Sequence, residues 1–461
     1  MLRSMTSSSP ALTFRGGLAG ALAPMAFFLA GVTTLALAGA PDERGFWPVL
    51  LGAWMIGLLL AHDRAAWSDA AIAAIAQPIV AIMVLAWLLA GVFGAILGAA
   101  GMVDGIVQAA LRIGVGPVGF VAVGFLACAL VSTATGTSFG TLLVAGPVVY
   151  GAGRALGADG PVLMGAVLAG ATWGDSISPI SDTSIASAGS QDTDVAGTVR
   201  SRLRYVVPAG LVALAASVTL AIMRSPGAAT APAADPSASP TALLLLIAPA
   251  VVIALLLRRR PLLEGLLTGI ALALVLGVGT GQLPLASVLR IDRAAYGARG
   301  VLVDGLGRGV GVSVFTILLM GLVGTVQASG ALSRLLDRPR AVAESPRGAE
   351  WRIVALLSGA VLLTTHSVVA ILAVGPLAGR LGSAAGLGAY RRANLLDLTA
   401  CTWPFLLPWF LPTILAAGAT GGAGLERLSP LTVGLHNTYA WALVLAVPLV
   451  ILTGYGRQAP G

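Results

Sequence analysis

Residues 171–190 have the sequence ATWGDSISPISDTSIASAGS and continue into apolar segments on both sides. They combine two aspartates with five serines before Ser190, and they contain Gly174 and Pro179, which weaken a continuous helix. Inside a membrane, non-helical backbone is tolerated only where it is buried in protein or lines a watery cavity, and ionisable residues mark functional sites. The stretch therefore predicts a broken transmembrane helix that carries the functional site. An ordinary polar loop between two spans is the alternative.

The composition predicts an all-α polytopic membrane protein. The 461 residues are 57% hydrophobic and 10% charged, and the mean hydropathy is +0.93. A soluble domain has about 25% charged residues. The ten-residue alternation of an outer-membrane β-barrel is absent. About ten apolar runs approach the ~20 residues of a spanning helix, and we predict spans at Gly17–Ala40, Phe46–Ala61, Ala71–Ala99, Pro161–Ser190, Tyr205–Met223, Thr241–Leu257, Pro261–Gly281, Gly309–Ala328, Ala389–Ala417 and Pro430–Thr453.

The chain divides almost in the middle, at a Pro/Ala/Ser-rich linker over residues 225–240. Residues 1–224 and 241–461 each hold five predicted spans in one order: helices, a hydroxyl-interrupted apolar stretch, a helix broken by Asp and Pro, and a final helix. The interrupted stretches, about 117–153 and 351–381, predict re-entrant hairpins, since each arm of roughly a dozen residues is too short to cross a bilayer. For the first stretch, one long kinked span is the alternative. Inverted repeats with broken helices at the midplane are typical of secondary transporters.

The charges predict an orientation and exclude one class of pump. All 27 basic residues are arginines, so a P-loop lysine and a nucleotide-driven pump within this chain are excluded. With both termini cytoplasmic, 18 arginines fall in inside segments and 9 outside, as the positive-inside rule requires. This bias explains the basic pI without nucleic acid. The start of the chain has no clear signal-peptidase site, so we expect it to be retained. Cys128 and Cys401 lie in apolar runs and indicate neither a disulfide nor a metal cluster.

The oxygen-rich side chains of the broken helix favour a hard cation. We expect Na⁺ at Asp175, Ser178 and Asp182, because carboxylates, hydroxyls and the carbonyls released near Pro179 are the ligands that such cations prefer. A carboxylate that holds either Na⁺ or a proton makes the two ions compete, because burial favours the protonated form and a bound cation the ionised form. For Asp182, capping of the returning half-helix is the alternative.

The hairpin tips and the second broken helix are expected to bring further groups to the same centre. The tips offer hydroxyls from Ser132, Thr133, Thr135, Thr137 and Ser138 around Gly136, and from Thr364, Thr365 and Ser367 around His366. From these we select Thr135, Gly136, Thr137, Thr365, His366 and Ser367, and from the broken helix Asp397 and Thr399. The alternatives are hydroxyls that bond back to the preceding turn, a structural His366, and a surface ion pair of Asp397 with Arg391 or Arg392. His436 and Asn437 are expected to be structural.

Two motifs resemble those of the NhaC family of bacterial Na⁺/H⁺ antiporters: TGTSFGT (135–141) and, about 35 residues later, GDSISPISDTS (174–184). The second half is similar, with DLTACTWPFLLPW (397–409) after its hairpin. The resemblance covers most of residues 70–455. It implies the fold of the ion-transporter superfamily, with a scaffold and a moving transport domain, and a location in the bacterial cytoplasmic (inner) membrane. It also implies an ion site that contains Asp175, Ser178, Ser181, Asp182 and Thr183.

We therefore expect a secondary transporter that exchanges Na⁺ for H⁺ by alternating access. The alternative is a Na⁺- or H⁺-coupled transporter of a small organic acid or amino acid. The candidate site segments contain no arginine, which favours an inorganic cation, although half-helix N-termini could hold a carboxylate. No HExxH, GxSxG or intramembrane Cys/His cluster supports an enzyme, and no cofactor is expected. The expected partners are the two ions and the lipid bilayer, without nucleic acid, and a homodimer is left open.

Overall fold

The computed structural model describes residues 12–38, 43–179, 181–224, 240–258, 260–293, 296–331, 334, 345–421 and 427–457. The first half contains η1 (Glu43–Phe46) and helices α1 (Gly17–Leu37), α2 (Trp47–Leu60), α3 (Arg64–Ile75), α4 (Pro78–Ala99), α5 (Met102–Arg112), α6 (Pro117–Thr135), α7 (Ser138–Ala155), α8 (Gly160–Ile177), α9 (Asp182–Gly189) and α10 (Val195–Arg224). The predicted linker 225–240 lies outside the described residues except for Pro240.

The second half adds a small antiparallel pair, β1 (Arg290–Asp292) and β2 (Gly297–Arg299), to further helices. These are η2 (Pro240–Leu246), α11 (Ile247–Leu257), α12 (Leu262–Gly279), α13 (Leu285–Val288), α14 (Val301–Ala328), α16 (Pro346–Thr364), α17 (Ser367–Ala384), α18 (Ala389–Ala400), η3 (Trp403–Phe405), α19 (Leu411–Ala419), α20 (Pro430–Leu435) and α21 (Thr438–Thr453). Six described helices are long and apolar enough to cross a membrane, and four shorter apolar helices accompany them. The predicted class, an all-α polytopic membrane protein, is confirmed.

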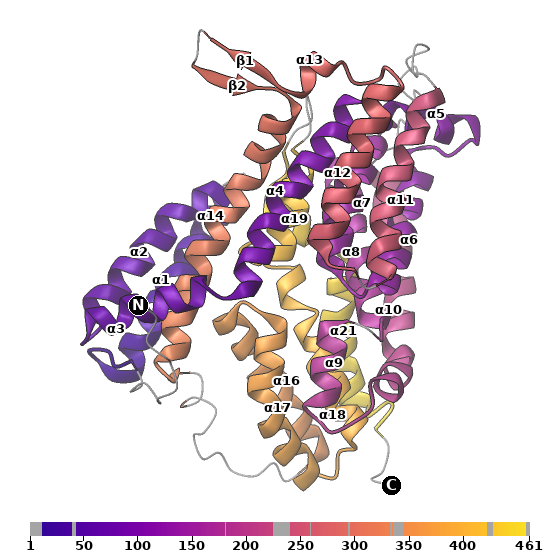
Figure 1. The fold of residues 1–461 in the computed structure, drawn as a ribbon. Coiled ribbons are helices and arrows are strands. Elements are labelled where there is room, and N and C mark those ends of the chain that lie inside the picture. Colours follow the sequence, from indigo (N-terminus) through magenta and orange to yellow (C-terminus); the bar gives the residue numbers. More distant parts are fainter. Residues whose placement is uncertain are drawn as a thin grey trace.

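Both interrupted apolar stretches form helical hairpins. The α6–α7 hairpin enters from the upper end of the molecule in Figure 1 and the α16–α17 hairpin from the lower end. Gly136 makes the first turn with a φ of +70°, a backbone conformation that glycine adopts without steric cost. Thr365 makes the second turn with a φ of +51°, which is strained for a β-branched residue. The tips therefore point toward each other near the middle of the bundle.

The hairpin arms are longer than the dozen residues expected. In each hairpin the first arm has 19 residues and the second has 18. At about 1.5 Å per residue, such an arm is roughly 27 Å long, so its length alone does not keep it from crossing a bilayer. The hydroxyl-rich residues 132–135 remain part of α6, and their threonine hydroxyls bond to the preceding turn. Thr133 donates to the Ala129 carbonyl at 2.7 Å and Thr135 to the Val131 carbonyl at 2.8 Å.

Glycine brings the first hairpin into direct contact with α8. A Cβ atom at Gly174 would lie 2.2 Å from the Ala129 carbonyl oxygen, and one at Gly170 would lie 2.1 Å from the Phe125 carbonyl oxygen. Because neither residue has a side chain, the backbones of α6 and α8 touch, as small residues allow in membrane helix pairs. This close packing fixes the depth of the first hairpin tip relative to the break between α8 and α9.

Several predicted spans have different limits in the structure. The span over residues 71–99 is divided into α3 and α4, because Pro78 disfavours helix at Gln77 and starts a new helix itself. Helix α10 begins ten residues before the predicted span at Tyr205, and α14 begins eight residues before Gly309. The span at 430–453 is divided into α20 and α21, since Asn437 caps α21 by accepting from the Ala440 backbone. The β1–β2 pair was not predicted.

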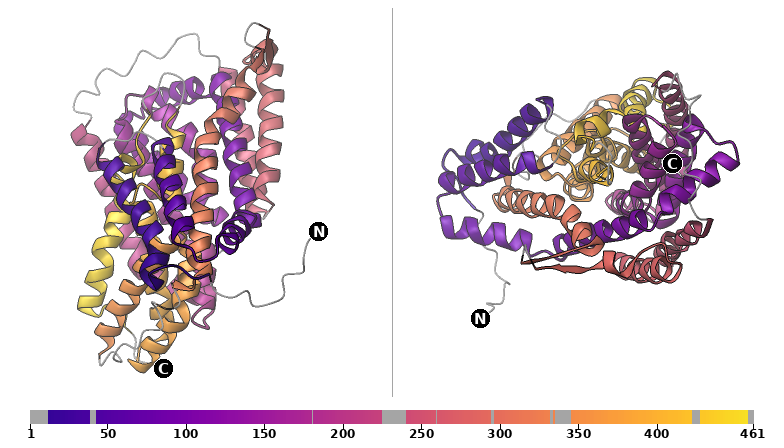
Figure 2. Two further views of the ribbon diagram at one scale, coloured as in Figure 1. Left: turned by 90° about the vertical axis from the view of Figure 1, so that its left-hand side faces the viewer. Right: turned by 90° about the horizontal axis from the view of Figure 1, so that it is seen from above.

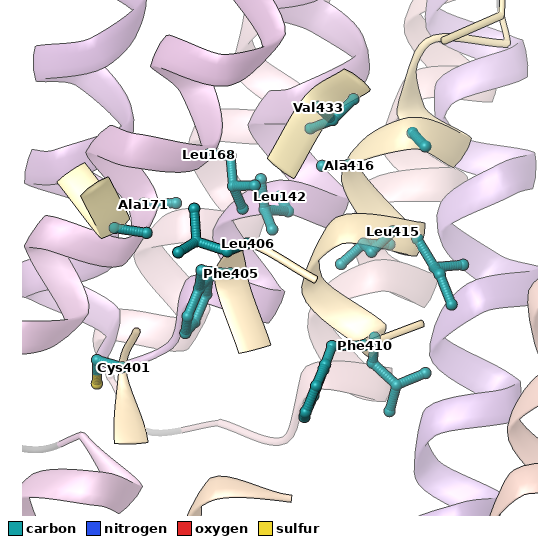
Figure 3. Packing of buried hydrophobic residues seen from close by; sticks show 14 of the residues in the cluster. Leu142, Leu168, Ala171, Cys401, Phe405, Leu406, Phe410, Leu415, Ala416 and Val433 are labelled. Atoms are coloured by element: carbon teal, nitrogen blue, oxygen red, sulfur yellow. The ribbon is translucent and has the colours of Figure 1, made fainter. Parts of the chain in front are cut away.

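The helices form two groups side by side. Helices α1, α2 and α3 pack around the lower part of α14, and the Trp54 indole donates to the Leu318 carbonyl at 2.9 Å. Seen from above in Figure 2, α1–α3 lie to one side of the C-terminal helices. The hairpins, the broken helices and α10 and α21 form the second group, whose interior around α19 is apolar (Figure 3). Phe410, in the break of the second broken helix, is buried in this interior.

A buried charge cluster joins three helices of the second group to the C-terminal segment. The fully buried Glu350 on α16 pairs with Arg391 on α18, with 2.8 Å between Nε and Oε1, and with Arg457 beyond α21. Arg391 also donates to the Tyr205 hydroxyl of α10 at 2.9 Å and lies over the Tyr205 ring. Charges in such surroundings are stable only when paired and hydrogen-bonded. Arg391 is thus committed to Glu350 and not to Asp397.

Candidate ion site

The interruption predicted in residues 171–190 is a true helix break, between Ile177 at the end of α8 and Asp182 at the start of α9. Asp175 lies in the last turn of α8 and is buried. Ser138, the first residue of α7, donates its hydroxyl to Asp175 Oδ2 at 2.9 Å, and the Ser181 hydroxyl also hydrogen-bonds this carboxylate. Asp175 Oδ1 is buried and has no hydrogen-bond partner among the described residues. The site therefore holds a carboxylate oxygen with unused capacity to bind a cation or a proton.

The other residues predicted at this break separate into a buried and an exposed group. Ser178 ends α8 and is buried, as are Ser181, which precedes α9, and Thr183 in its first turn. Asp182 is the first residue of α9 and is exposed, and no side-chain cap is formed at this helix start. Its charge lies at the positive end of the α9 dipole. Capping of α9 by Asp182 is therefore wrong, and Asp182 is exposed whereas Asp175 is buried.

The tip of the first hairpin contributes Ser138 to the site. This residue directly follows the three tip residues that we selected from the sequence. Thr135 bonds back to its own helix, Gly136 makes the turn, and Thr137 caps α7 by accepting from the Gly140 backbone at 3.2 Å. The hydroxyls of Thr135 and Thr137 are thus used within the hairpin. Ser138, the first residue of α7, forms the hydrogen bond that connects this tip to Asp175 on α8.

The tip of the second hairpin contacts the second broken helix, as expected. Ser367 donates to the Ala400 carbonyl at 2.9 Å, next to the break that follows α18. Thr365 donates to the neighbouring Thr364 carbonyl. His366 precedes α17, and its Nδ1 is buried without a hydrogen-bond partner among the described residues. The structure therefore brings this tip to the second break, with Thr365 used locally and His366 holding an unused nitrogen.

Asp397 is part of a buried ion pair. Its Oδ2 lies 2.8 Å from Nη2 of Arg202 on α10, and both side chains are fully buried. The alternative of a surface pair with Arg391 or Arg392 is wrong, since Arg391 pairs with Glu350 and Arg392 donates to Gln191. Arg202, which lies outside the candidate site segments of the sequence, thus enters the site. A start of α10 at Val195 carries Arg202 two turns into the helix, where it faces α18.

A chain of polar contacts connects the two aspartates. Ser181, which bonds Asp175, lies 3.1 Å from the Thr183 hydroxyl, and Thr183 lies 3.8 Å from the Cys401 sulfur. Cys401 in turn contacts Asp397 Oδ1 at 3.4 Å. Nearby, the Thr399 hydroxyl is buried without a partner among the described residues. The first half of the chain and the second therefore meet in one buried polar network, the crossing site, in which the two carboxylates influence each other electrostatically.

A cavity of about 590 Å³ lies on the α7 side of the crossing site. It is lined by α4, α7, α14 and α19, and Arg154, Asp304 and Arg308 are its charged residues. Leu142, one helical turn after Ser138, lines the cavity together with Leu415 of α19. Apolar side chains of α7 and α19 thus line the cavity, and on α7 they begin one turn after Ser138, which contacts Asp175.

The loop between α9 and α10 is attached to the start of α18 outside the crossing site. Asp194 accepts from the Tyr390 hydroxyl and from the Gly197 backbone N–H, and both hydrogen bonds lower the pKa of this exposed carboxyl. An aspartate whose carboxylate accepts from the backbone N–H three residues later is a typical N-cap at the start of a helix. This feature of the sequence could have located the beginning of α10, and with it the burial of Arg202.

Residues 66–223 match the sequence profile of the "Na+/H+ antiporter family". Three relatives are similar over comparable segments. The Na(+)/H(+) antiporter NhaC of Alkalihalophilus pseudofirmus is 37% identical over 160 residues, 32% of this chain and 34% of that protein. The Malate-2H(+)/Na(+)-lactate antiporter of Bacillus subtilis is 30% identical over 163 residues, 35% and 34% of the two chains. The Arginine/ornithine antiporter ArcD of Halobacterium salinarum is 34% identical over 111 residues, 24% and 23% of the two chains.

The aligned part spans about a third of the length of the first two relatives and less of the third. The solved structure of the YdaH transporter of Alcanivorax borkumensis aligns with 96% of this chain over 100% of its own length, at 16% identity and a TM-score of 0.35. The matched residues 66–223 contain both motifs of the first half, at 135–141 and 174–184. Over this segment the chain is similar to the Na⁺/H⁺ antiporter family, and the predicted resemblance to NhaC is confirmed by the 37% identity over 160 residues.

Proposed function

We propose that this protein exchanges Na⁺ for H⁺ across the bacterial cytoplasmic membrane. The observation that carries the proposal is Asp175, a buried carboxylate with one oxygen unpartnered among the described residues, held by Ser138 and Ser181 at a helix break. Such a group binds a hard cation or a proton, and the two compete for it. The family match over residues 66–223 includes all three residues.

The proposed Na⁺ ligands are Asp175, Ser178 and Asp182. Ser178 ends α8 beside Asp175, and Asp182 begins α9 across the break. In the present conformation Asp182 is exposed, so we place it at the water-accessible side of the ion and Asp175 at the buried side. The remaining proposed contributors are the hydroxyls of Ser181, Thr183 and Ser367, with His366 and Thr399 at the second hairpin tip and break.

We further propose that the chain consists of two inverted repeats, residues 1–224 and 241–461, with five spans each. The order of elements supports this division. One hairpin, a helix broken after an aspartate and a final helix follow three spans in each half, and the hairpins enter from opposite ends (Figure 1). The broken helices α8–α9 and α18–α19 meet at the crossing site. In such an arrangement, rocking of one group of helices against the other opens the site alternately to the two sides.

The central test is transport by the purified protein in lipid vesicles. A Na⁺ gradient is applied, and proton movement is followed with an internal pH indicator. We expect Na⁺ to move protons in the opposite direction, and K⁺ at equal concentration to have no effect, because a compact site of carboxylate and hydroxyl oxygens favours a small hard cation. Absence of Na⁺-dependent proton movement above that of protein-free vesicles would refute the proposal.

A small organic acid is the second candidate substrate. The cavity of about 590 Å³ is far larger than Na⁺ needs, and Arg154 and Arg308 could attract a carboxylate into it. The similar Bacillus subtilis protein is a malate and lactate antiporter by name. In the same vesicle assay, a panel of carboxylates and amino acids tests this candidate. Proton or Na⁺ movement that requires malate, lactate or arginine would favour it over simple cation exchange.

The proposed orientation, with both termini cytoplasmic, predicts a labelling pattern. Tyr296, in the β1–β2 turn before α14, is 98% exposed, and His62, between α2 and α3, is exposed near the other end of α14, where Leu12 bonds to Ala328 and His62 to Thr13. Cys128 and Cys401 are both buried, so the unmodified protein should not react with the thiol reagent and serves as the background. In intact cells, Tyr296→Cys should react with a membrane-impermeant thiol reagent, and His62→Cys should react only after the cells are opened. The reverse pattern would refute this orientation.

A further inference from the structure

Arg202 is a fully buried cation that reaches both broken helices. Besides the 2.8 Å pair with Asp397, its Nη1 donates to the Ser176 carbonyl at 3.0 Å and to the Ser184 hydroxyl at 2.9 Å. Ser176 lies in the last turn of α8, where carbonyl groups lack partners within the helix and carry partial negative charge. The positive charge of the guanidinium thus balances two negative charges: the partial charge at the C-terminal end of α8 and the carboxylate of Asp397 on α18.

The remaining donors of Arg202 are also used. Its Nε donates to Asn394 Oδ1 at 3.3 Å, and its Nη2 lies 3.4 Å from the Ser187 hydroxyl. All three nitrogens of the guanidinium therefore have protein partners, and the side chain has no exposed surface. A group in this state cannot act as the anchor of an arriving carboxylate. This set of contacts requires the planar guanidinium with its five donors. A lysine ammonium cannot reproduce it.

The buried carboxylates of the described residues differ in how their charge is balanced. Glu350 pairs with Arg391 and Arg457, and Asp397 pairs with Arg202. Asp175 forms no ion pair with a described residue and keeps one oxygen unpartnered. Asp397 belongs to the same buried network as Asp175, through the Ser181–Thr183, Thr183–Cys401 and Cys401–Asp397 contacts of 3.1, 3.8 and 3.4 Å. Without Arg202, this network would hold two uncompensated carboxylates.

We infer that Arg202 is a positioning residue that occupies Asp397 as a built-in cation, so that the transported cation meets one free carboxylate, Asp175. The inference rests on the proposed cation exchange and specifies how its site is divided. An arginine is always charged in proteins, so the pair persists over the pH range in which the protein works. Arg202 also donates to the Ser176 carbonyl, one residue from Asp175.

The test compares Na⁺ binding by two variants of the whole protein. In Asp397→Asn, Arg202 loses its counter-charge and is expected to turn to Asp175, the buried carboxylate without an ion pair among the described residues, in direct competition with Na⁺. The Na⁺ concentration that half-saturates the protein should rise about tenfold or more. In Asp397→Asn/Arg202→Gln both charges are absent, and the half-saturating concentration should return to within about threefold of the original value. Binding is measured as the Na⁺-dependent rise in unfolding temperature, against choline at equal ionic strength.

Arg204→Gln is the matched control, because this neighbouring arginine is half-buried and donates to the Ser201 carbonyl, outside the crossing site. It should leave Na⁺ binding unchanged. If Asp397→Asn does not fold, the double variant still tests the inference, because it lacks both the Asp397 carboxylate and the Arg202 guanidinium and so leaves neither unpaired. Unchanged binding in Asp397→Asn would show that Arg202 does not compete with Na⁺ for Asp175, and weak binding in the double variant would show that Asp397 itself holds the ion. Either result would overturn the inference. Absence of Na⁺ binding in the unmodified protein would instead refute the proposed function.

Discussion

Asp175→Asn is expected to reduce Na⁺-dependent proton movement in vesicles to the level of protein-free vesicles. The amide preserves the shape of the side chain and can still accept the hydrogen bond from Ser138, so the protein should fold and keep its unfolding temperature within a few degrees. It cannot take up a proton and has no negative charge for a cation. Because Asp175 is the buried carboxylate without an ion pair among the described residues, no neighbouring group replaces it.

Two comparisons make this result specific. Asp69→Asn, an exposed aspartate on α3 outside the crossing site, should transport normally. Asp182→Asn should raise the half-saturating Na⁺ concentration but keep the maximal rate measurable, because Asp182 is exposed and lies on the opposite side of the break. Near-normal exchange by Asp175→Asn at equal protein content would remove this residue from the mechanism and transfer its proposed role to Asp182.

Glu350→Ala is expected to cause the largest loss of stability. Glu350 is the shared partner of Arg391 and Arg457, and its removal leaves two arginines without their counter-charge in buried or half-buried surroundings. Breaking a buried ion pair by removing one partner costs about 3–5 kcal/mol. The unfolding temperature of the purified protein in detergent should therefore fall by many degrees, or the variant should not accumulate in the membrane. Glu350→Gln should lose less, since its amide oxygen can still accept from one arginine.

Glu264→Ala on α12 is the matched control for this effect. Its side chain is 43% exposed and pairs with Arg260 one turn away at 3.7 Å. Exposed pairs of this kind contribute at most about 1 kcal/mol and often less. The unfolding temperature should hardly change. Equal stability of Glu350→Ala and the unmodified protein would mean that the Glu350 cluster does not hold the C-terminal segment and α16 together.

The sequence by itself determined the membrane class and the positions of the helix breaks. Gly174, Pro179 and the surrounding hydroxyls predicted the break that the structure shows between α8 and α9. The turns at Gly136 and Thr365 likewise fall within the predicted hydroxyl-rich tips. These features are local: proline removes a backbone donor, glycine permits a turn, and serine and threonine end helices by bonding to nearby backbone groups. Neighbouring residues therefore suffice to indicate them.

Only the tertiary structure decided which polar side chains meet. Asp397 has Arg391 and Arg392 within two turns, yet its partner is Arg202, 195 residues earlier on another helix. Ser138, and not the neighbouring Thr135 or Thr137, reaches Asp175, because the direction of a side chain depends on where α7 begins and how α6 packs on α8. Ion pairing is governed by the distance between charges in a poorly solvated interior. That distance is set by helix packing and cannot be obtained from spacing along the chain.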